Sequence, residues 1–568
     1  MPLKPIYGKT PLTEMKALPL YPGQITVKED CLKPMETLLK GAAEADMALW
    51  ESALRLSFAS RDVTGQTKLA ALIRDTLKDQ KDNGEMPLPL NKALQVMNAA
   101  WALYEVKPDK QLLESMMRWC ASLAADWSKV EDCTAIRTGA GDLMKLLCNL
   151  YRVTGRKGLT TLCEKLRQLS IDWSGALHTF SVQRPMKKMI DCKTLDEGMA
   201  AENGNGAGFY TRQYLLCHGE TLADGARACL ESSVYSGNGP ESRAAKDGWE
   251  KISRWHGAVC GGVTSDETLA GLSANSAVDA ASLGAWAETF AKQLEVDADS
   301  AWAASELEKL MKNGMPAAVQ SGKLVCFQRG NGLEEDCGTK DCYRVQHTSV
   351  QKPRALARLA RGWAAAVEHA VMVIPAGAQV NLYLNGEYSL KMNGQAVKLI
   401  VSGQDGEYTI EVEVKEDVKA SVALMVPAWT DDACIRVNDE GADEGHAGTY
   451  LTLERTWKNG DCIHVSFAQC LKVKEGYHQS AVISYGAKTM AYVPQNGLWA
   501  VALCDEPEVK DGKVVVKLAH VPGWKAVGAV PNDLPVRPET DGDVFEAELK
   551  PYAETSVRMT MLPRSSKA

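Results

Sequence analysis

A short run of the chain, "NGLEEDCGTKDCYRVQHTSVQKPR" at 331–354, carries carboxylates, two cysteines and a histidine directly before a helical pattern. Carboxylate, thiolate and imidazole groups are the ligand types of a zinc site. The four candidate ligands are Glu335, Cys337, Cys342 and His347. Their spacing matches no short zinc motif, so a solvated loop and a Cys337–Cys342 disulfide are the alternatives. The favoured prediction is a site without a cofactor, with zinc as the alternative.

The composition limits the classes of protein that the chain can belong to. Its 568 residues carry a net charge of -8 and contain no basic run, which argues against a nucleic-acid partner. No apolar stretch approaches the roughly 20 residues that a membrane helix needs. The N-terminal stretch lacks a continuous apolar signal core, so we expect a cytoplasmic protein. The 16 cysteines are scattered without regular spacing, and we expect most of them to be reduced and buried.

The first part of the chain, 1–370, has helical periodicity throughout. Segments such as "NKALQVMNAAWALYEV" and "KQLLESMMRWCASLAADW" place apolar residues at three- and four-residue intervals. Glycine, proline, aspartate and asparagine separate these segments at short intervals. About a dozen helices in hairpins favour an (α/α)6 barrel. A helical solenoid is the alternative, but no fixed-period repeat supports it.

Beyond residue 370 the period of the apolar pattern changes from 3.6 to 2. Segments such as "EYTIEVEVKEDVKASVALMVPAW" alternate polar and apolar residues, and turns such as "LNGE" and "WKNGD" separate them. This pattern predicts an antiparallel β-sandwich at 371–475. A second β-rich module at 476–568 is expected to complete the sandwich. The predicted fold is therefore a helical barrel followed by β-sandwich modules.

Several motifs resemble those of one enzyme family. The segments "VPAWTDDACIRVND" and "GTYLTLERTWKNGDCIHVSF" in the β-rich half, and "RWHGAVCGGVTSDETLAG" at 254–271, are similar to elements of glycoside hydrolase family 127. This is the β-L-arabinofuranosidase-like superfamily, and the resemblance runs from about residue 40 to 562. It implies a glycoside hydrolase of bacterial type that removes a terminal sugar from a plant or host oligosaccharide.

The resemblance also implies where the chain departs from the family. The family's catalytic zinc is held by a Glu-x-Cys pair and a later cysteine cluster. These positions fall on Ala274 and Ser276, and on His347 and Thr348, in this sequence. Alanine, serine and threonine are not normal zinc ligands. We therefore expect that the usual zinc–thiolate centre is lost and that carboxylates carry the catalysis.

Cleavage of a glycosidic bond needs a proton donor for the leaving oxygen and a second group for the anomeric carbon. Glu267 matches the family's general acid in the "DETL" element, and Asp266 beside it is a candidate partner. The alternative interpretation is that both residues merely start a loop. Further candidates for the second carboxylate are Glu197, Glu335, Asp336 and Asp341.

Other polar and aromatic residues are predicted to bind the substrate. His256 and Trp255 lie in "RWHG", Glu202 and Asn203 lie in "MAAENGNG", and His347 follows the cysteine-containing run. A histidine or tryptophan in a helical pattern is about as often a core residue as a substrate-binding residue. This alternative stays open for His256 and Trp255.

Two other functions remain as alternatives to a glycosidase. A lyase or uronide hydrolase on the same scaffold would need a base and positive charge near the uronate. A carbohydrate-binding relative with a decayed site would bind glycans without turnover. In each case the expected partner is an oligosaccharide or glycoside, and a homodimer is compatible with the sequence.

Overall fold

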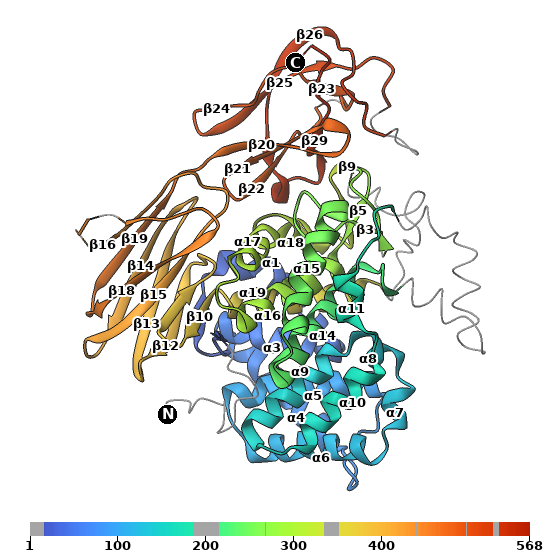
Figure 1. Cartoon of the computed structure of the whole chain (residues 1–568), viewed down its shortest axis with the longest axis vertical. Coiled ribbons are helices and arrows are strands. Elements are labelled where there is room, and N and C mark those ends of the chain that lie inside the picture. Colours follow the sequence, from blue (N-terminus) through green and yellow to red (C-terminus); the bar gives the residue numbers. More distant parts are fainter. Residues whose placement is uncertain are drawn as a thin grey trace.

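The computed structural model describes residues 16–185, 215–266, 268–333, 351–438, 440–441, 443–495, 497–525 and 533–567. Its N-terminal half is built from helices, in agreement with the helical periodicity of the sequence (Figure 1). Their bounds are α1 Glu29–Leu39, α2 Ala42–Ala45, α3 Trp50–Ala59, α4 Val63–Lys78, α5 Leu90–Val106, α6 Lys110–Ala125, α7 Ser128–Glu131, α8 Thr134–Gly139, α9 Gly141–Thr154, α10 Gly158–Leu169, α11 Trp173–His178, α14 Gly219–Ser236, α15 Gly239–His256, α16 Ala280–Val296, α17 Ala301–Lys309, α18 Met315–Ala317 and α19 Gln351–Glu368.

Six of these helices form a closed inner ring. Each contacts the next in the order α3, α5, α9, α14, α16 and α19, and α19 contacts α3 again. The hairpin partners α4, α6, α10, α15 and α17 pack against this ring. Within the described residues this is the (α/α)6 arrangement that the sequence predicted, and the solenoid alternative is excluded because the ring closes.

Two glycines set the closest approach within the ring. A Cβ at Gly284 of α16 would clash with the carbonyl oxygen of Arg358 on α19. A Cβ at Gly362 of α19 would lie 2.5 Å from the carbonyl oxygen of Gly284. The two helices therefore pack backbone against backbone, which only glycine permits at these positions. This contact brings the polar side chains of α16 and α19 together inside the barrel.

The β-sandwich follows α19, as the change of period predicted. One sheet has the strand order β1-β10-β11-β15-β18 and the other β17-β16-β19-β14-β13-β12-β2, and β11 and β15 form a parallel pair among otherwise antiparallel neighbours. The strands are β10 Val371–Ile374, β11 Gly377–Val380, β12 Gly386–Met392, β13 Gln395–Gln404, β14 Glu407–Val414, β15 Val418–Val426, β16 Ala433–Val437, β17 Asp443–Glu444, β18 Thr449–Trp457 and β19 Asp461–Phe467.

Two short strands from the N-terminal end of the chain complete these sheets. β1 (Leu18–Pro19) pairs with β10, and β2 (Ile25–Val27) pairs with β12. Ile25 and Val27 are buried, so this segment belongs to the hydrophobic core that the barrel and the sandwich share. The segment precedes the helical barrel in the sequence, where a single helical domain over 1–370 was expected. The division into three domains itself stays a prediction.

The last part of the chain folds around its own hydrophobic cluster, which includes Ile483, Leu503 and Leu518. Its strands are β20 Leu471–Glu475, β21 Ala481–Tyr485, β22 Lys488–Ala491, β23 Val501–Leu503, β24 Glu508–Lys510, β25 Lys513–His520, β26 Asp541–Glu548, β27 Lys550–Pro551, β28 Val557–Met559 and β29 Met561–Leu562. β28 pairs with β9 (Asn331–Leu333), which connects this module to the helical half.

The stretch between α15 and α19 contains the expected helices α16 and α17 and, in addition, short strands that the helical pattern did not predict. β3 (Ser265–Asp266) and β4 (Thr268–Leu269) form a hairpin, and β5 (Ala277–Asp279) pairs with β8 (Phe327–Arg329). Gly261, Gly262 and Gly271 have positive φ angles around the hairpin, in the non-helical segment that separates α15 from α16.

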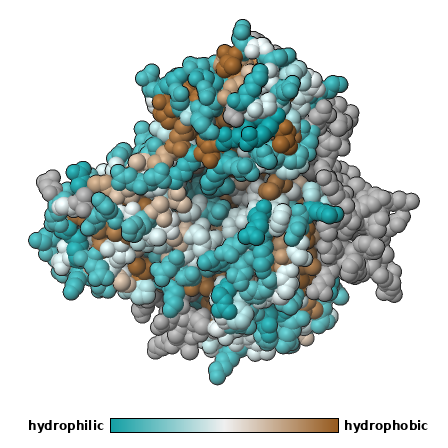
Figure 2. Space-filling model, turned by 45° about the horizontal axis from the view of Figure 1, so that its top comes forward, coloured by the Kyte–Doolittle hydropathy of each residue, from teal (hydrophilic) through white to brown (hydrophobic). Residues whose placement is uncertain are grey.

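The described surface has no single large hydrophobic patch on the face that Figure 2 shows. Hydrophobic side chains form small separate groups among hydrophilic ones there. Among the described residues the exposed large hydrophobic side chains are Val63, Trp255, Val509, Val536 and Val544, and of these only Val536 and Val544 are close in the sequence. Among the described helices, none has the length and apolar character required to cross a bilayer.

Candidate active site

A cavity of about 660 Å³ opens at one end of the helical barrel. Its wall comes from five helices of the ring, which are α3, α5, α9, α14 and α19, and from α8, Asp46 and the 3-10 helix Met47–Leu49. This volume lies within the range of roughly 300–1,000 Å³ that is typical of small-molecule sites. Because side chains from five inner helices line it, this cavity is the principal candidate for the functional site.

Three arginines on α19 face the base and rim of the cavity. Arg354, Arg358 and Arg361 follow one another at spacings of four and three residues, so they share one face of the helix. Arg354 Nη2 lies 2.5 Å from Glu220 Oε2, and Arg358 Nε lies 2.5 Å from Glu220 Oε1. Arg358 also pairs with Asp224. The arginine row is therefore neutralised by carboxylates of the opposite wall.

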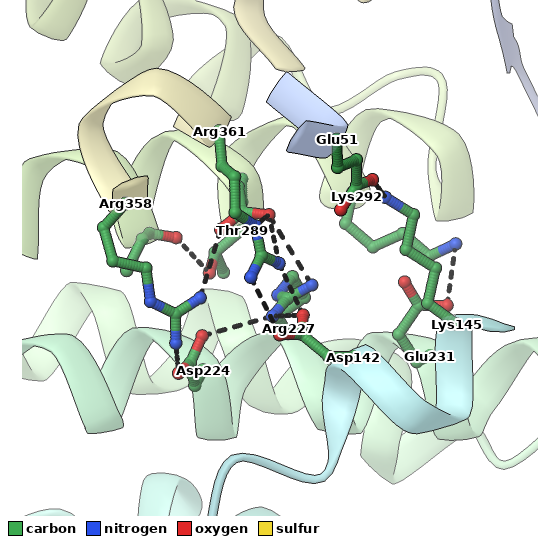
Figure 3. A network of polar contacts seen from close by, with 12 residues as sticks. Glu51, Asp142, Lys145, Asp224, Arg227, Glu231, Thr289, Lys292, Arg358 and Arg361 are labelled. Carbon is green, nitrogen blue, oxygen red and sulfur yellow. Dashed lines mark hydrogen bonds and ion pairs between the residues drawn. The ribbon is translucent and has the colours of Figure 1, made fainter. Parts of the chain in front are cut away.

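The deeper arginines join four inner helices (Figure 3). Arg361 Nη1 donates to Asp142 Oδ2 of α9 at 2.8 Å and its Nη2 donates to Glu288 Oε1 of α16 at 2.7 Å. Arg227 Nη2 of α14 donates to Asp142 Oδ1 at 2.6 Å. Buried charges are stable only when they are paired in this way. The network fixes the base of the cavity.

A second ionic layer lies deeper in the barrel. Arg55 is paired with three carboxylates: Glu105 at 2.8 Å, Glu368 at 2.9 Å and Glu51 at 3.3 Å. Lys292 pairs with Glu231 at 3.0 Å and Glu295 at 2.7 Å, and His369 Nε2 lies 3.0 Å from Glu295 Oε1. Glu51 and Arg361 line both the main cavity and a small polar cavity of about 50 Å³ beneath it. The barrel axis is thus polar along much of its length.

The buried carboxylates differ in pKa: it is lowered for Glu51 and Glu220 and raised for Asp224 and Glu105. Burial raises the pKa of Glu51 and Glu220, but the opposing charges of Lys145 and Arg55 on Glu51, and of Arg354 and Arg358 on Glu220, lower each pKa to about 2. Burial raises the pKa of Asp224 and Glu105, and the neighbouring arginines offset this only in part. Glu51 and Glu220 are therefore fully ionised at neutral pH.

The start of α14 connects the cavity to the hairpin of the "RWHG…DETL" element. The backbone N–H of Leu269 donates to the carbonyl of Cys217 at 2.8 Å, and His218 forms a β-bridge with Thr268. His218 caps α14 through its Nδ1, which accepts from the backbone N–H of Thr221 at 3.3 Å. Burial and the charge of Arg354 lower the pKa of His218 to about 3, so its ring is neutral.

His256 is a buried residue at the end of α15. Its Nε2 donates to the carbonyl of Val182 at 3.0 Å, and its Nδ1 accepts from the backbone N–H of Gly271 at 3.0 Å. Burial lowers the pKa of the ring, in agreement with a neutral imidazole that holds two backbone segments together. A role in binding the substrate stays a prediction, and it would require one of these bonds to be exchanged.

The other predicted residues fall in three groups. Trp255 is 38% exposed in the last turn of α15, and neither Trp255 nor His256 lines the cavity. The backbone of Asp266 lies in β3. The remaining predicted residues lie outside the described part of the chain: Glu267, Glu197, Glu202, Asn203, Glu335, Asp336, Asp341, Cys337, Cys342 and His347.

The positions that the resemblance assigns to a zinc ligand pair do not fit a metal. Ala274 has no donor atom and packs in a small hydrophobic cluster with Leu534 and Met561. The hydroxyl of Ser276 donates to the carbonyl of Ala270 at 2.7 Å. Among the described residues no group of three or more metal-ligating side chains occurs, and the run at 334–347 lies outside them. The described cysteines, from Cys31 to Cys504, are free thiols.

Sequence reasoning missed the charged residues of the cavity, although a signal was present. Glu220, Asp224 and Arg227 lie at spacings of four and three residues within the apolar helix α14, and the arginines of α19 repeat the same spacing. Two helices with charges on one face usually expose that face to solvent. Here the spacing marks the inner face of a polar barrel.

Comparison with known proteins agrees with this architecture. Residues 377–469 match the family model "Beta-L-arabinofuranosidase, GH127 middle domain". No curated protein sequence matches the chain significantly. A solved structure described as a glycoside hydrolase is similar over 98% of this chain and 100% of its own, with a TM-score of 0.74 and 13% identity.

Two further solved structures carry more specific descriptions. A GH127 β-L-arabinofuranosidase from Geobacillus stearothermophilus T6 is similar over 93% of this chain and 92% of its own, with a TM-score of 0.66 and 15% identity. The GH127 β-arabinofuranosidase BT3674 is similar over 97% and 98%, with a TM-score of 0.68 and 12% identity. The fold is therefore that of glycoside hydrolases with a helical barrel and a β-sandwich. The predicted resemblance to family 127 is confirmed, through the middle domain at 377–469 and the shared fold of the whole chain.

Removal of Arg55 should strongly destabilise the fold. Arg55→Met leaves three buried carboxylates without their common partner, and breaking a buried ion pair of this kind costs about 3–5 kcal/mol. Lys68→Met is the matched control because Lys68 pairs with Glu44 on the surface at 2.9 Å. We expect the control to change the thermal unfolding midpoint too little to resolve. Equal midpoints for the two variants would contradict the structural role of the buried network.

Stability should also fall in acid, in a window set by the buried carboxylates. The pKa of Glu51 is about 2 in the folded protein, against about 4.3 in an unfolded chain. The folded state binds fewer protons between these values, so the stabilisation is complete above about pH 4.5 and is lost toward pH 2. The unfolding midpoint of Glu51→Gln, measured from pH 5 to pH 2.5, should fall less steeply than that of the wild type. Parallel curves would show that Glu51 does not have the depressed pKa.

Proposed function

We propose that the chain is a glycoside hydrolase that removes a terminal sugar from an oligosaccharide by carboxylate acid/base catalysis at the mouth of the barrel cavity. One observation supports this location above all others. The β3–β4 hairpin of the "RWHG…DETL" element is hydrogen-bonded to the start of α14, and Glu220 in the first turn of α14 lines the cavity. Thr268 and Leu269, which follow position 267, therefore contact the residues directly before α14, whose first turn lines a sugar-sized cavity.

Glu267 is proposed as the general acid, and Asp266, Glu197, Glu335, Asp336 and Asp341 as candidates for its partner. Glu220 does not suit the role of base, although it lies in the cavity wall. Its pKa of about 2 makes it too weak to accept a proton from water, because Arg354 and Arg358 stabilise its charge. We assign Glu220 the positioning of these two arginines.

The proposed substrate follows from the family that the fold resembles. A β-L-arabinofuranoside is the first substrate to test, because two of the similar structures are described as arabinofuranosidases. The proposed site contains no zinc, since neither Ala274 nor Ser276 supplies a ligand. A bacterial origin and a cytoplasmic location are part of this proposal.

Glu267→Gln should abolish most of the turnover. Loss of a general acid lowers kcat about 10²- to 10⁴-fold, and the loss should be smaller for a p-nitrophenyl glycoside, whose leaving group needs little protonation, than for an alkyl glycoside. Glu131→Gln, a change of an exposed glutamate in α7, is the matched control and should keep full activity. Full activity of Glu267→Gln on any substrate that the wild type cleaves would remove the assignment. Glycan binding by the wild type without turnover would indicate the binding protein instead.

Metal analysis tests the cofactor. Elemental analysis of protein purified without chelators should find zinc far below one equivalent, and excess EDTA should leave the rate unchanged. Near-stoichiometric zinc that disappears in Cys337→Ser or Cys342→Ser would reverse the proposal, and a zinc-bound thiolate would become the leading nucleophile. Cys470→Ser, which changes another partly exposed cysteine, is the control for nonspecific effects of thiol removal.

A further inference from the structure

The part of the cavity wall that α5 forms carries three amide side chains. Asn91, Gln95 and Asn98 follow one another on α5 at spacings of four and three residues, and all three line the cavity. They interrupt a helix whose other faces are packed in the apolar core, where Leu94, Met97 and Trp101 are buried. The position of three amides on one helical face is therefore not explained by the packing of the barrel.

Two of these amides lack a hydrogen-bond partner in the part of the chain that the structure describes. Asn98 is only 8% exposed, and no hydrogen bond or ion pair of its side chain is found in the part of the chain that the structure describes. The Oε1 atom of Gln95 is buried and has no hydrogen-bond partner there either. A buried amide that lacks partners costs free energy unless a ligand or water satisfies it. Their common orientation toward one cavity indicates that a ligand does so.

The charges around the cavity determine what kind of ligand fits. Its described wall contains five carboxylates, which are Asp46, Glu51, Asp142, Glu220 and Asp224, and four cations, which are Lys92, Arg354, Arg358 and Arg361. Each cation is already paired with a carboxylate: Lys92 with Asp46 at 3.4 Å and the arginines with Glu220, Asp224, Asp142 and Glu288. An anionic ligand would meet no excess positive charge and would lie near carboxylates.

Much of the remaining wall is apolar, although Thr138 and Thr221 also line it. Met47, Leu94, Ile136 and Leu143 line the cavity near the amides. A neutral sugar matches both surfaces, because its hydroxyl groups both donate to and accept from carboxamides while its C–H groups pack on apolar side chains. A uronate or a sulfated sugar matches the amides but not the charge of the wall.

We propose that the amide face of α5, formed by Asn91, Gln95 and Asn98, is a subsite for a neutral sugar residue of the substrate. Its ligand class is an uncharged pentose or hexose unit held through its hydroxyl groups. The inference rests on the proposed function only in taking the ligand to be a sugar. It separates the glycosidase from a uronide-cleaving enzyme on the same scaffold, because the latter would need a cationic subsite.

The test measures binding, so that it does not depend on turnover. L-Arabinose, D-galactose and D-galacturonate share the configuration of their ring hydroxyls and differ mainly in the substituent at C5, so they vary charge within one shape. Titration of the full-length Glu267→Gln protein, followed by saturation-transfer NMR, should show binding of the two neutral sugars and at least tenfold weaker binding of D-galacturonate. Equal or tighter binding of D-galacturonate would overturn the proposal, and so would the absence of binding by all three sugars.

Variants of α5 locate the subsite. Asn98→Leu and Gln95→Leu replace each amide by an apolar side chain of comparable size, and each should weaken the binding of the neutral sugars at least tenfold. Gln111→Leu changes an exposed residue on α6 and should bind as the parent does. Because both α5 substitutions remove unsatisfied amides, we expect the thermal midpoint to be kept or raised. Unchanged binding in folded Asn98→Leu and Gln95→Leu would refute the subsite.

The outcomes distinguish this inference from the proposed function. If the wild type has no glycosidase activity but binds neutral sugars in a way that depends on Asn98, the subsite is supported and the proposed enzymatic function is rejected. If turnover depends on Glu267 but is unaffected by Asn98→Leu, the proposed enzymatic function is supported and the subsite is rejected.

Discussion

The structure depends on the pairing of charges that the barrel buries along its axis. Arg55, Arg227, Arg358 and Arg361 each contact carboxylates of at least two other elements. A buried ion pair adds little net stability over an apolar pair of the same volume, but it strongly disfavours any arrangement that separates its members. The network therefore acts mainly as a constraint on the mutual position of α9, α14, α16 and α19.

The backbone contact between Gly284 and Gly362 makes this constraint possible. Close approach of α16 and α19 places Arg358 and Arg361 within hydrogen-bond distance of Glu288, and α14 supplies Asp224 and Arg227 from the other side. The amides of α5 stand apart from this network, since no hydrogen bond joins the side chain of Gln95 or Asn98 to it within the described residues. One wall of the cavity is thus saturated by internal contacts and the other is available to a ligand.

Much of the fold could be predicted from the sequence, because period and turn chemistry are local signals. The change from a 3.6-residue to a 2-residue period near Val371 coincides with the start of β10. The pairing of β2 with β12 could not be predicted, because it joins Ile25 to Tyr388 across more than 360 residues and the three-residue strand is too short to show a period. The cavity acids Glu220 and Asp224 were missed for a related reason. Charged residues at helical spacing have the same appearance on a solvated face and on the inner face of a polar barrel.

The "RWHG…DETL" element shows how a motif can combine two kinds of constraint. His256 ties Val182 to Gly271 through both ring nitrogens, and the carbonyl of His256 accepts from the backbone N–H of Thr264 at 2.7 Å. These bonds shape the turn that leads into the β3–β4 hairpin, whatever the chemistry of the site. A histidine at this position is therefore required by the fold and says little about catalysis. Glu267 lies outside the described residues, and its role as general acid stays a proposal that the structural role of His256 neither supports nor weakens.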